Sequence, residues 1–223
     1  ESFHSRKGAL LEAKTKFISP SQLNRAKSED LHVLDVCMGL GYNSAALMEE
    51  ISSIPRKLSW WGLELDRRPL VQALKNQNFN SIWSSLVLTR LEAIRDKGCW
   101  KDNTSQGEVL WGDARCELNH LPSDLKFELI MHDAFSPQCC PQLWSEEFIT
   151  SLAKRLAPQG RLVTYCRAAA VRASMKKAGL KVYSLVPCPR DKESWSAGTL
   201  AILPDTHNTC LPAPTSYQEL TPI

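Results

Sequence analysis

The alternation of short apolar runs with amphipathic stretches predicts a parallel sheet covered by helices. Both patterns recur in turn along residues 32–180, which is typical of doubly wound α/β domains. The expected strands are residues 32–38, 58–65, 108–111, 127–131 and 161–166. Two more apolar runs, at 181–186 and 199–203, have only a loop between them and predict an antiparallel pair. The expected fold class is therefore α/β, with a mostly parallel seven-stranded sheet and a C-terminal antiparallel hairpin.

Three parts of the chain differ in pattern and set the expected organisation. Residues 1–30 hold an amphipathic stretch and a proline-interrupted linker, which predicts a helical extension packed on the core. Residues 31–203 form the main domain, with a polar loop at 102–107 and a helical insertion at about 79–100. The insertion suits either a cover over the substrate or plain core. The proline-rich residues 204–223 predict a poorly ordered tail.

A glycine-rich turn after the first strand is the first sign of a ligand site. Gly39 and Gly41 follow the apolar run Val33–Met38, and a helical pattern begins at about Asn43. Glycines let a ligand approach the backbone, and the free N–H groups of a helix start attract an anionic group. The turn predicts a nucleotide-type cofactor, although two glycines after a strand are as often a simple turn.

Acidic residues stand at or near the ends of four successive strands, namely Asp35, Glu64, Asp113 and Asp133. Ligands of doubly wound sheets bind beyond the carboxyl ends of the strands, so the four are expected to converge on one rim. Glu64 suits a ribose diol, and Asp113 suits an adenine amino group. A third glycine and the lysine of a phosphate-binding loop are missing, which points to S-adenosylmethionine. The alternative is that each acid only caps a helix.

Asp133 is expected at the methyl-acceptor position. A carboxylate there can orient a substrate amine and take up its proton. Phe135, two residues further on, can wall the site or stack on a base.

The charge distribution suggests an anionic macromolecule as partner. Residues 1–27 carry six basic and two acidic residues, and residues 154–192 carry ten basic residues and one acidic residue. The whole chain has a net charge of only +3, so the basic residues are concentrated in two segments. Nucleic acid is the partner that this pattern favours. The alternative is that lysine and arginine merely solvate helix faces.

The remaining composition narrows the class of protein. The chain is 43% hydrophobic, and its apolar runs are all shorter than the roughly 18 residues that cross a bilayer. We therefore expect a cytoplasmic protein without a membrane partner, with no demand for more than a monomer. The eight cysteines lack the spacing of a zinc site or of a secreted disulfide framework, so we expect reduced thiols and no structural metal.

The strand-end motifs resemble those of the methyltransferase domain of MnmC-type enzymes. The motifs are Val33–Asn43, Gly62-Leu63-Glu64, Trp111-Gly112-Asp113, Asp133-Ala134-Phe135-Ser136-Pro137 and Pro141-Gln142-Leu143-Trp144. This family modifies the wobble uridine of certain tRNAs. The resemblance implies a Rossmann-like fold, S-adenosylmethionine as methyl donor, and the tRNA anticodon stem-loop as partner. The implied reaction converts a 5-aminomethyl group into 5-methylaminomethyl.

The resemblance also assigns roles to residues. The implied cofactor-binding residues are Gly39, Gly41, Asn43, Glu64, Asp113, Asp35 and Glu12. Asp133 and Phe135 are implied at the transfer site. The implied tRNA contacts are Arg167, Arg172, Lys176, Lys177, Arg190 and Lys192. The FAD-dependent oxidase half of many members is missing from this sequence, so only the methyl step is implied.

Two other functions fit parts of the pattern. Aminopropyl transfer of the spermidine-synthase type uses a related fold and an acid at the end of the fourth strand. The two basic segments disfavour its cationic substrate. A non-catalytic module that binds tRNA or cofactor would not need all four strand-end acids.

Overall fold

The strands form one mixed sheet in the computed structural model, which describes residues 8–25, 30–187, 198–205 and 218–222. The strands are β1 (Asp30–Val36), β2 (Lys57–Glu64), β3 (Cys99–Lys101), β4 (Ser105–Trp111), β5 (Phe127–His132), β6 (Leu156–Thr164), β7 (Lys181–Pro187), β8 (Thr199–Ile202) and β9 (Gln218–Pro222). Their order is β3-β4-β2-β1-β5-β6-β8-β7-β9. The central strands β4, β2, β1, β5 and β6 are parallel, and β8 pairs antiparallel with both β6 and β7. The expected parallel sheet and C-terminal antiparallel pair are confirmed.

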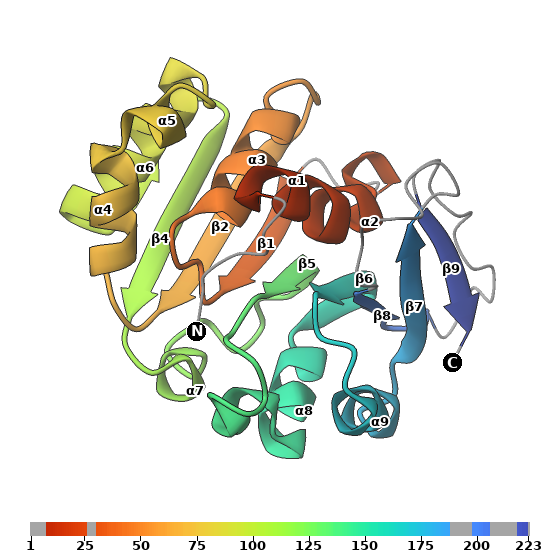
Figure 1. Ribbon diagram of the computed structural model, residues 1–223. Helices are drawn as coiled ribbons and strands as arrows, with labels where there is room; N and C mark the ends of the chain where they lie inside the picture. The colour runs from red at the N-terminus through yellow and green to blue at the C-terminus, as the bar shows by residue number, and fades with distance from the viewer. Residues whose placement is uncertain (1–7, 26–29, 188–197, 206–217, 223) are drawn as a thin grey trace.

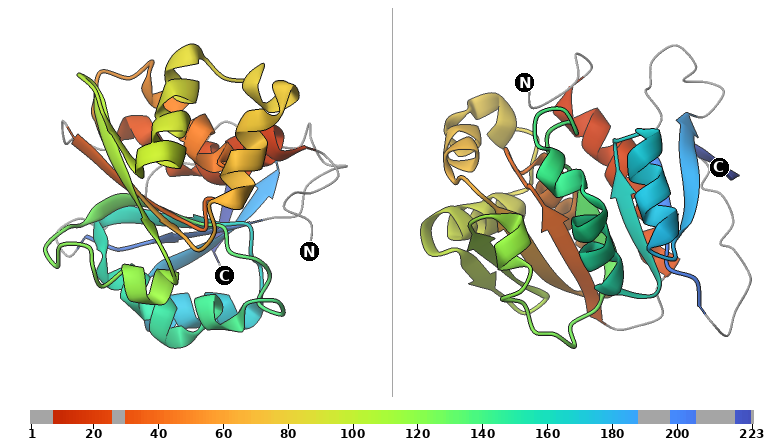
Figure 2. Two further views of the ribbon diagram at one scale, coloured as in Figure 1. Left: turned by 90° about the vertical axis from the view of Figure 1, so that its left-hand side faces the viewer. Right: turned by 90° about the horizontal axis from the view of Figure 1, so that it is seen from below.

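Helices cover both faces of the sheet (Figure 1). On one face lie α1 (Ala9–Glu12), η1 (Ala13–Ile18), α2 (Ser19–Ser21), η2 (Leu23–Arg25), α3 (Tyr42–Ile51), α4 (Arg68–Lys75), α5 (Gln77–Asn80) and α6 (Ser85–Lys97). On the other lie α7 (Ala114–Glu117), η3 (Pro141–Trp144), α8 (Glu146–Lys154) and α9 (Ala169–Lys177). The two helix layers with the sheet between them are seen edge-on in Figure 2. Each layer buries its own apolar cluster against the sheet.

Over the described residues the sheet has nine strands, so the expectation of seven was wrong by one strand at each edge. Residues 102–107 were expected to be a polar loop, but β3 and β4 form a hairpin there. The Asp102 carboxylate accepts hydrogen bonds from the backbone N–H groups of Thr104 and Ser105, both at 2.8 Å, and so closes the turn. Polar residues stabilise this turn, which is why a polar run masks the hairpin in the sequence.

The C-terminal segment also differs from expectation. Residues 204–223 predict a poorly ordered tail, but residues 218–222 form β9 and pair antiparallel with β7. Residues 206–217 lie outside the described residues.

The N-terminal extension is fixed on the sheet through a buried arginine. Arg161 of β6 is 1% exposed, and its guanidinium donates to the backbone carbonyl of Pro20 and to the side-chain carbonyl of Gln22. Phe17 of η1 is completely buried in the same apolar cluster as α3. The helical segment 9–21 is thereby held over α3 and β6, close to the ends of the central strands.

Candidate active site

Loops that follow the central strands meet at one rim of the sheet. The N–H of Cys37 donates to the carbonyl of Leu63, and the N–H of Asp133 donates to the carbonyl of Val36. Because β1 lies between β2 and β5, strand order reverses at this point. Such a switch point opens the crevice in which doubly wound sheets bind ligands.

The glycine-rich loop has an unusual backbone. Cys37, Gly39 and Gly41 have φ angles of 66°, 54° and 86°, so alternate residues adopt left-handed conformations. Gly41 is the N-cap of α3, and a Cβ atom there would lie 3.2 Å from Cδ1 of Leu70. A strained loop next to a helix start is typical of a ligand cradle.

Glu64 is held in place by the backbone on both sides. Its two carboxylate oxygens accept from the N–H of Gly39 at 2.8 Å and from the N–H of Asp66 at 3.0 Å. Burial raises the pKa of Glu64 above its ordinary value, although these N–H groups offset part of the rise. Each oxygen keeps a further lone pair, so the carboxylate can accept two hydroxyl groups. The next residue, Leu65, is 75% exposed and sits beside it as an apolar surface.

Asp35 lies beneath the loop and not on its surface. It is fully buried, and its Oδ2 accepts from the hydroxyl of Ser44 at 2.5 Å. Burial raises the pKa of Asp35 to about 7, while the Ser44 hydroxyl lowers it in part. Asp35 therefore fixes the start of α3 from below.

Asp113 follows β4 and caps α7. Its Oδ1 accepts from the N–H of Arg115 at 2.9 Å, and its Oδ2 accepts from the Arg115 guanidinium at 2.5 Å. The hydrogen bonds from Arg115 lower the pKa of Asp113. The alternative of a helix cap thus describes this residue, and any ligand there must share its carboxylate with Arg115.

Asp133 stands at the end of β5, across the glycine loop from Glu64. The side-chain amide of Asn43 donates to its Oδ2 at 2.7 Å. Burial raises the pKa of Asp133 well above its usual range, and the Asn43 amide lowers it in part. Asp35 and Glu12 raise this pKa further, whereas Lys16 lowers it. Asn43 and Glu12, both expected around the cofactor, therefore belong to the surroundings of Asp133 in this structure.

The segment after Asp133 is rigidly supported. The carbonyl of Phe135 accepts from the indole N–H of Trp144 at 2.6 Å and from the thiol of Cys140 at 3.0 Å. The neighbouring His132 is fully buried, and burial lowers its pKa to about 4, so its ring is neutral at pH 7. The Phe135 ring is 41% exposed at the rim.

Two residues near Asp133 were missed in the sequence analysis. Lys16 is 5% exposed and forms an ion pair with Glu12, one turn earlier on the extension. Tyr165, just past the end of β6, places its ring 5.9 Å from the Lys16 ammonium. These two residues are far apart in the sequence and meet only when the chain packs. The one signal in the sequence is that Lys16 falls on the apolar side of an amphipathic pattern, whereas nothing in the sequence indicates Tyr165.

The predicted tRNA contacts separate into groups. Arg167 is exposed immediately after β6, on the rim side. Arg172 instead ties α9 to the C-terminal hairpin, because its guanidinium donates to the hydroxyls of Thr199 and Ser184. Lys176 and Lys177 are exposed in the last turn of α9, at the opposite end of the sheet from the rim, and Lys177 pairs with Glu146 at 2.8 Å. Arg190 and Lys192 lie outside the described residues.

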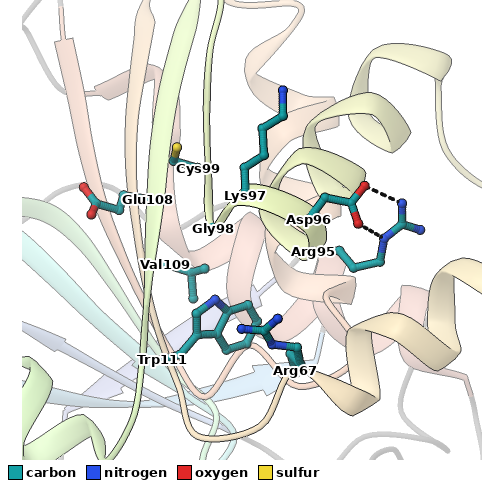
Figure 3. A pocket seen from close by; sticks show the side chains of 9 residues that line it. All are labelled: Arg67, Arg95, Asp96, Lys97, Gly98, Cys99, Glu108, Val109 and Trp111. Atoms are coloured by element: carbon teal, nitrogen blue, oxygen red, sulfur yellow. Dashed lines mark hydrogen bonds and ion pairs between the residues drawn. The ribbon is translucent and has the colours of Figure 1, made fainter.

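A cavity of about 240 Å³ adjoins the rim between the start of α4 and the end of α6 (Figure 3). Its lining residues are Arg67, Arg95, Asp96, Lys97, Gly98, Cys99, Glu108, Val109 and Trp111. The Arg67 guanidinium lies 5.5 Å from the Trp111 ring, and Arg95 pairs with Asp96. Trp111 is in register with Glu64 on the neighbouring strand, so the cavity borders the cofactor side of the rim.

Within the described residues, three or more His, Cys, Asp or Glu side chains nowhere gather as metal ligands would. None of the helices in this part of the chain has the length and apolar character to cross a membrane.

Comparison with known families decides the class of protein. A family profile described as S-adenosyl-L-methionine-dependent methyltransferase matches residues 77–199. The chain belongs to this methyltransferase family. S-adenosylmethionine is therefore its cofactor, as the glycine-rich turn and the strand-end acids predict.

Relatives of this methyltransferase include MnmC proteins, which confirms the resemblance. The chain is 24% identical over 207 residues to the tRNA 5-methylaminomethyl-2-thiouridine biosynthesis bifunctional protein MnmC of Delftia acidovorans. That match covers 87% of this chain and 32% of the relative. The uncharacterized protein MJ0670 of Methanocaldococcus jannaschii is 29% identical over 192 residues, which cover 82% of this chain and 49% of the relative. The chain thus spans half or less of the length of these relatives.

Solved structures of related proteins also superpose on this chain. The crystal structure of MnmC2 from Aquifex aeolicus superposes with a TM-score of 0.74 at 27% identity, covering 91% of this chain and 63% of that one. A probable spermidine synthase from Corynebacterium glutamicum gives a TM-score of 0.52 at 15% identity, covering 89% of this chain and 64% of that one, which shows a shared fold alone.

Proposed function

We propose that this methyltransferase methylates the 5-aminomethyl group of the tRNA wobble uridine to 5-methylaminomethyl. The observation that carries the proposal is Asp133, which is fixed by Asn43 at the strand switch point beside the exposed ring of Phe135. The similarity to MnmC proteins supports tRNA as substrate.

The residues of the rim fit S-adenosylmethionine. The glycine loop adopts left-handed conformations that residues with a side chain rarely adopt, and a Cβ at Gly41 would crowd Leu70 in the core, so glycine holds this loop against the start of α3. The Glu64 carboxylate would accept the ribose hydroxyls, and the exposed Leu65 side chain would cover the adenine. Asp35 would hold the loop in shape from beneath. The bound cofactor supplies an electrophilic methyl group on a sulfonium.

Asp133 would prepare the acceptor amine. An amine must present a neutral lone pair to an incoming methyl group, so its ammonium form must first lose a proton. Burial raises the pKa of Asp133, which makes its carboxylate a better proton acceptor than an exposed one. The hydrogen bond from Asn43 leaves the other carboxylate oxygen for the amine. Asp133 would thus orient the amine and take up its proton.

The anticodon stem-loop would lie across the rim. Phe135 would stack on the extruded uridine or a neighbouring base. Arg167 on one side of Asp133, and Arg67 with Lys97 around the cavity on the other, would contact phosphates. Lys176 and Lys177 would play little part, because α9 carries them away from the rim.

The test is a direct assay of the modified nucleoside. Purified protein is incubated with S-adenosylmethionine and with tRNA that carries 5-aminomethyl uridine, and the tRNA nucleosides are analysed by mass spectrometry. We expect conversion of 5-aminomethyl to 5-methylaminomethyl uridine, and none with tRNA that carries unmodified uridine. Binding of both substrates without conversion would contradict the proposal. Conversion of putrescine with decarboxylated cofactor would instead identify an aminopropyltransferase.

A further inference from the structure

We propose that Glu12, Asp133 and the ring of Tyr165 form the binding site for the ammonium of the acceptor, and that Lys16 occupies this site until the acceptor displaces it. This inference rests on the proposed function, because it names the groups that recognise the acceptor amine.

The first observation is the position of Lys16. Its side chain is 7% exposed, although lysine is almost never buried without a partner. The partner is Glu12, at i−4 on the same helical segment. The segment Ala13–Ile18 is a π-helix, a conformation that is frequent at functional sites. Within this π-helix Lys16 is buried like its apolar neighbour Phe17, so its ammonium points into the protein and not into solvent.

The second observation is the aromatic ring over the ammonium. The Lys16 Nζ lies 5.9 Å from the centroid of Tyr165, within the range of a cation–π contact. The Tyr165 hydroxyl donates to the carbonyl of Ala134 at 2.9 Å. This hydrogen bond fixes the ring against the residue that directly follows Asp133.

The third observation links the pair to Asp133 through Tyr165. The ring that faces Lys16 is bonded to the carbonyl of Ala134, the residue that follows Asp133. In keeping with this position, the charge of Glu12 raises the pKa of Asp133 and the charge of Lys16 lowers it. The Lys16 ammonium therefore contacts the Glu12 carboxylate and faces the Tyr165 ring, with the Asp133 carboxyl on the same side of the rim. A carboxylate–aromatic site of this kind recognises ammonium ions in general.

These contacts give Lys16 the chemistry of the acceptor itself. The side chain of lysine ends in a methylene-linked primary ammonium, as does a 5-aminomethyl group. With Lys16 in the site, the carboxylates of Glu12 and Asp133 are compensated while the acceptor is absent. An incoming aminomethyl group can take over these contacts when Lys16 swings out, and the site then holds the reacting nitrogen next to Asp133.

The kinetic test compares variants of Lys16 and Glu12 in methylation of tRNA that carries 5-aminomethyl uridine. Lys16→Met removes the competing ammonium and keeps most of the apolar volume, so we expect KM for the tRNA to fall about tenfold. Glu12→Gln weakens the site for the acceptor, so KM should rise about tenfold. Lys14→Met is the matched control, since Lys14 is exposed on the same segment and should leave KM unchanged. A Lys16→Met protein with an unchanged or higher KM would overturn the proposal.

A second test does not depend on tRNA and so separates this inference from the proposed function. Lys16→Ala removes three methylene groups and the ammonium, which leaves a space with the length of a propylammonium ion beside Glu12. We expect n-propylammonium to raise the melting temperature of this variant and to leave the wild-type protein unaffected, and we expect n-propanol to have no such effect. Equal stabilisation by the alcohol, or none by the amine, would show that the site does not recognise an ammonium. Failure of the nucleoside assay with success here would leave the ammonium site standing and refute the tRNA substrate alone.

Discussion

The two halves of the rim are built in different ways. The cofactor half, around Glu64, draws on residues 35–66, and backbone N–H groups hold its central carboxylate. The acceptor half, around Asp133, joins the extension (Glu12, Lys16), the start of α3 (Asn43) and the end of β6 (Tyr165). Its contacts are between side chains from segments far apart in the sequence. A strand–turn–helix unit can specify a cofactor site by itself, whereas an acceptor site depends on how the whole chain packs.

The largest effect on cofactor affinity is expected at Glu64. Glu64→Ala removes the carboxylate that accepts two ribose hydroxyls. It also leaves the N–H groups of Gly39 and Asp66 without a hydrogen-bond acceptor, so we expect the affinity for S-adenosylmethionine to fall about a hundredfold. Isothermal titration calorimetry measures this directly. Asp66→Ala, which removes a half-buried carboxylate two residues after Glu64, is the control and should change the affinity less than threefold. An equal loss of affinity in both variants would show that Glu64 has no special role in binding the cofactor.

A pH dependence of stability is expected from the buried carboxyl of the cofactor half. Burial raises the pKa of Asp35 to about 7 in the folded protein, from an ordinary value of 3.8. The folded state therefore binds the proton more tightly, and this group contributes stability at low pH that is lost as pH rises from about 4 to 7. Compared with Asp35→Asn, the wild-type protein should lose a few kcal/mol of unfolding free energy between pH 5 and pH 8. Urea unfolding at the two pH values gives this difference.

The control for that measurement is Asp66→Asn, because hydrogen bonds from Arg68 lower the pKa of Asp66. This variant should not reproduce the loss. If the difference between wild type and Asp35→Asn were the same at pH 5 and pH 8, Asp35 would not be held protonated by the fold.

The smallest effect is expected from the basic residues. Replacing Arg67 and Lys97 with glutamine removes two cations near the rim, so we expect KM for tRNA to rise severalfold. The slope of the logarithm of the tRNA binding constant against the logarithm of the salt concentration should also become shallower by between one and two. The matched control replaces Lys176 and Lys177, at the far end of α9, and should change neither. A larger effect of the control pair would place the tRNA on the α9 side.

The sequence predicts the cofactor half of the rim better than the acceptor half. The apolar runs predict that the central strands are parallel, although not their order in the sheet. Glu64 and the glycine loop are found from their positions at strand ends alone. The edge strand β3 escapes prediction because polar side chains such as Asp102 stabilise its turn. The sequence also cannot show that Arg172 is used inside the fold, since its partners Ser184 and Thr199 come from later strands. The neighbourhood of Lys16 and Tyr165 exists only after the extension packs across the sheet.

The most direct test of the division between the two halves is Asp133→Asn. Asparagine keeps the shape and can still bond to Asn43, but it cannot take up a proton from the acceptor. We expect single-turnover methyl transfer to fall by a factor of about 100 or more, while the affinity for S-adenosylmethionine measured on the same protein stays within threefold of wild type. Transfer at the normal rate by this variant would contradict the account.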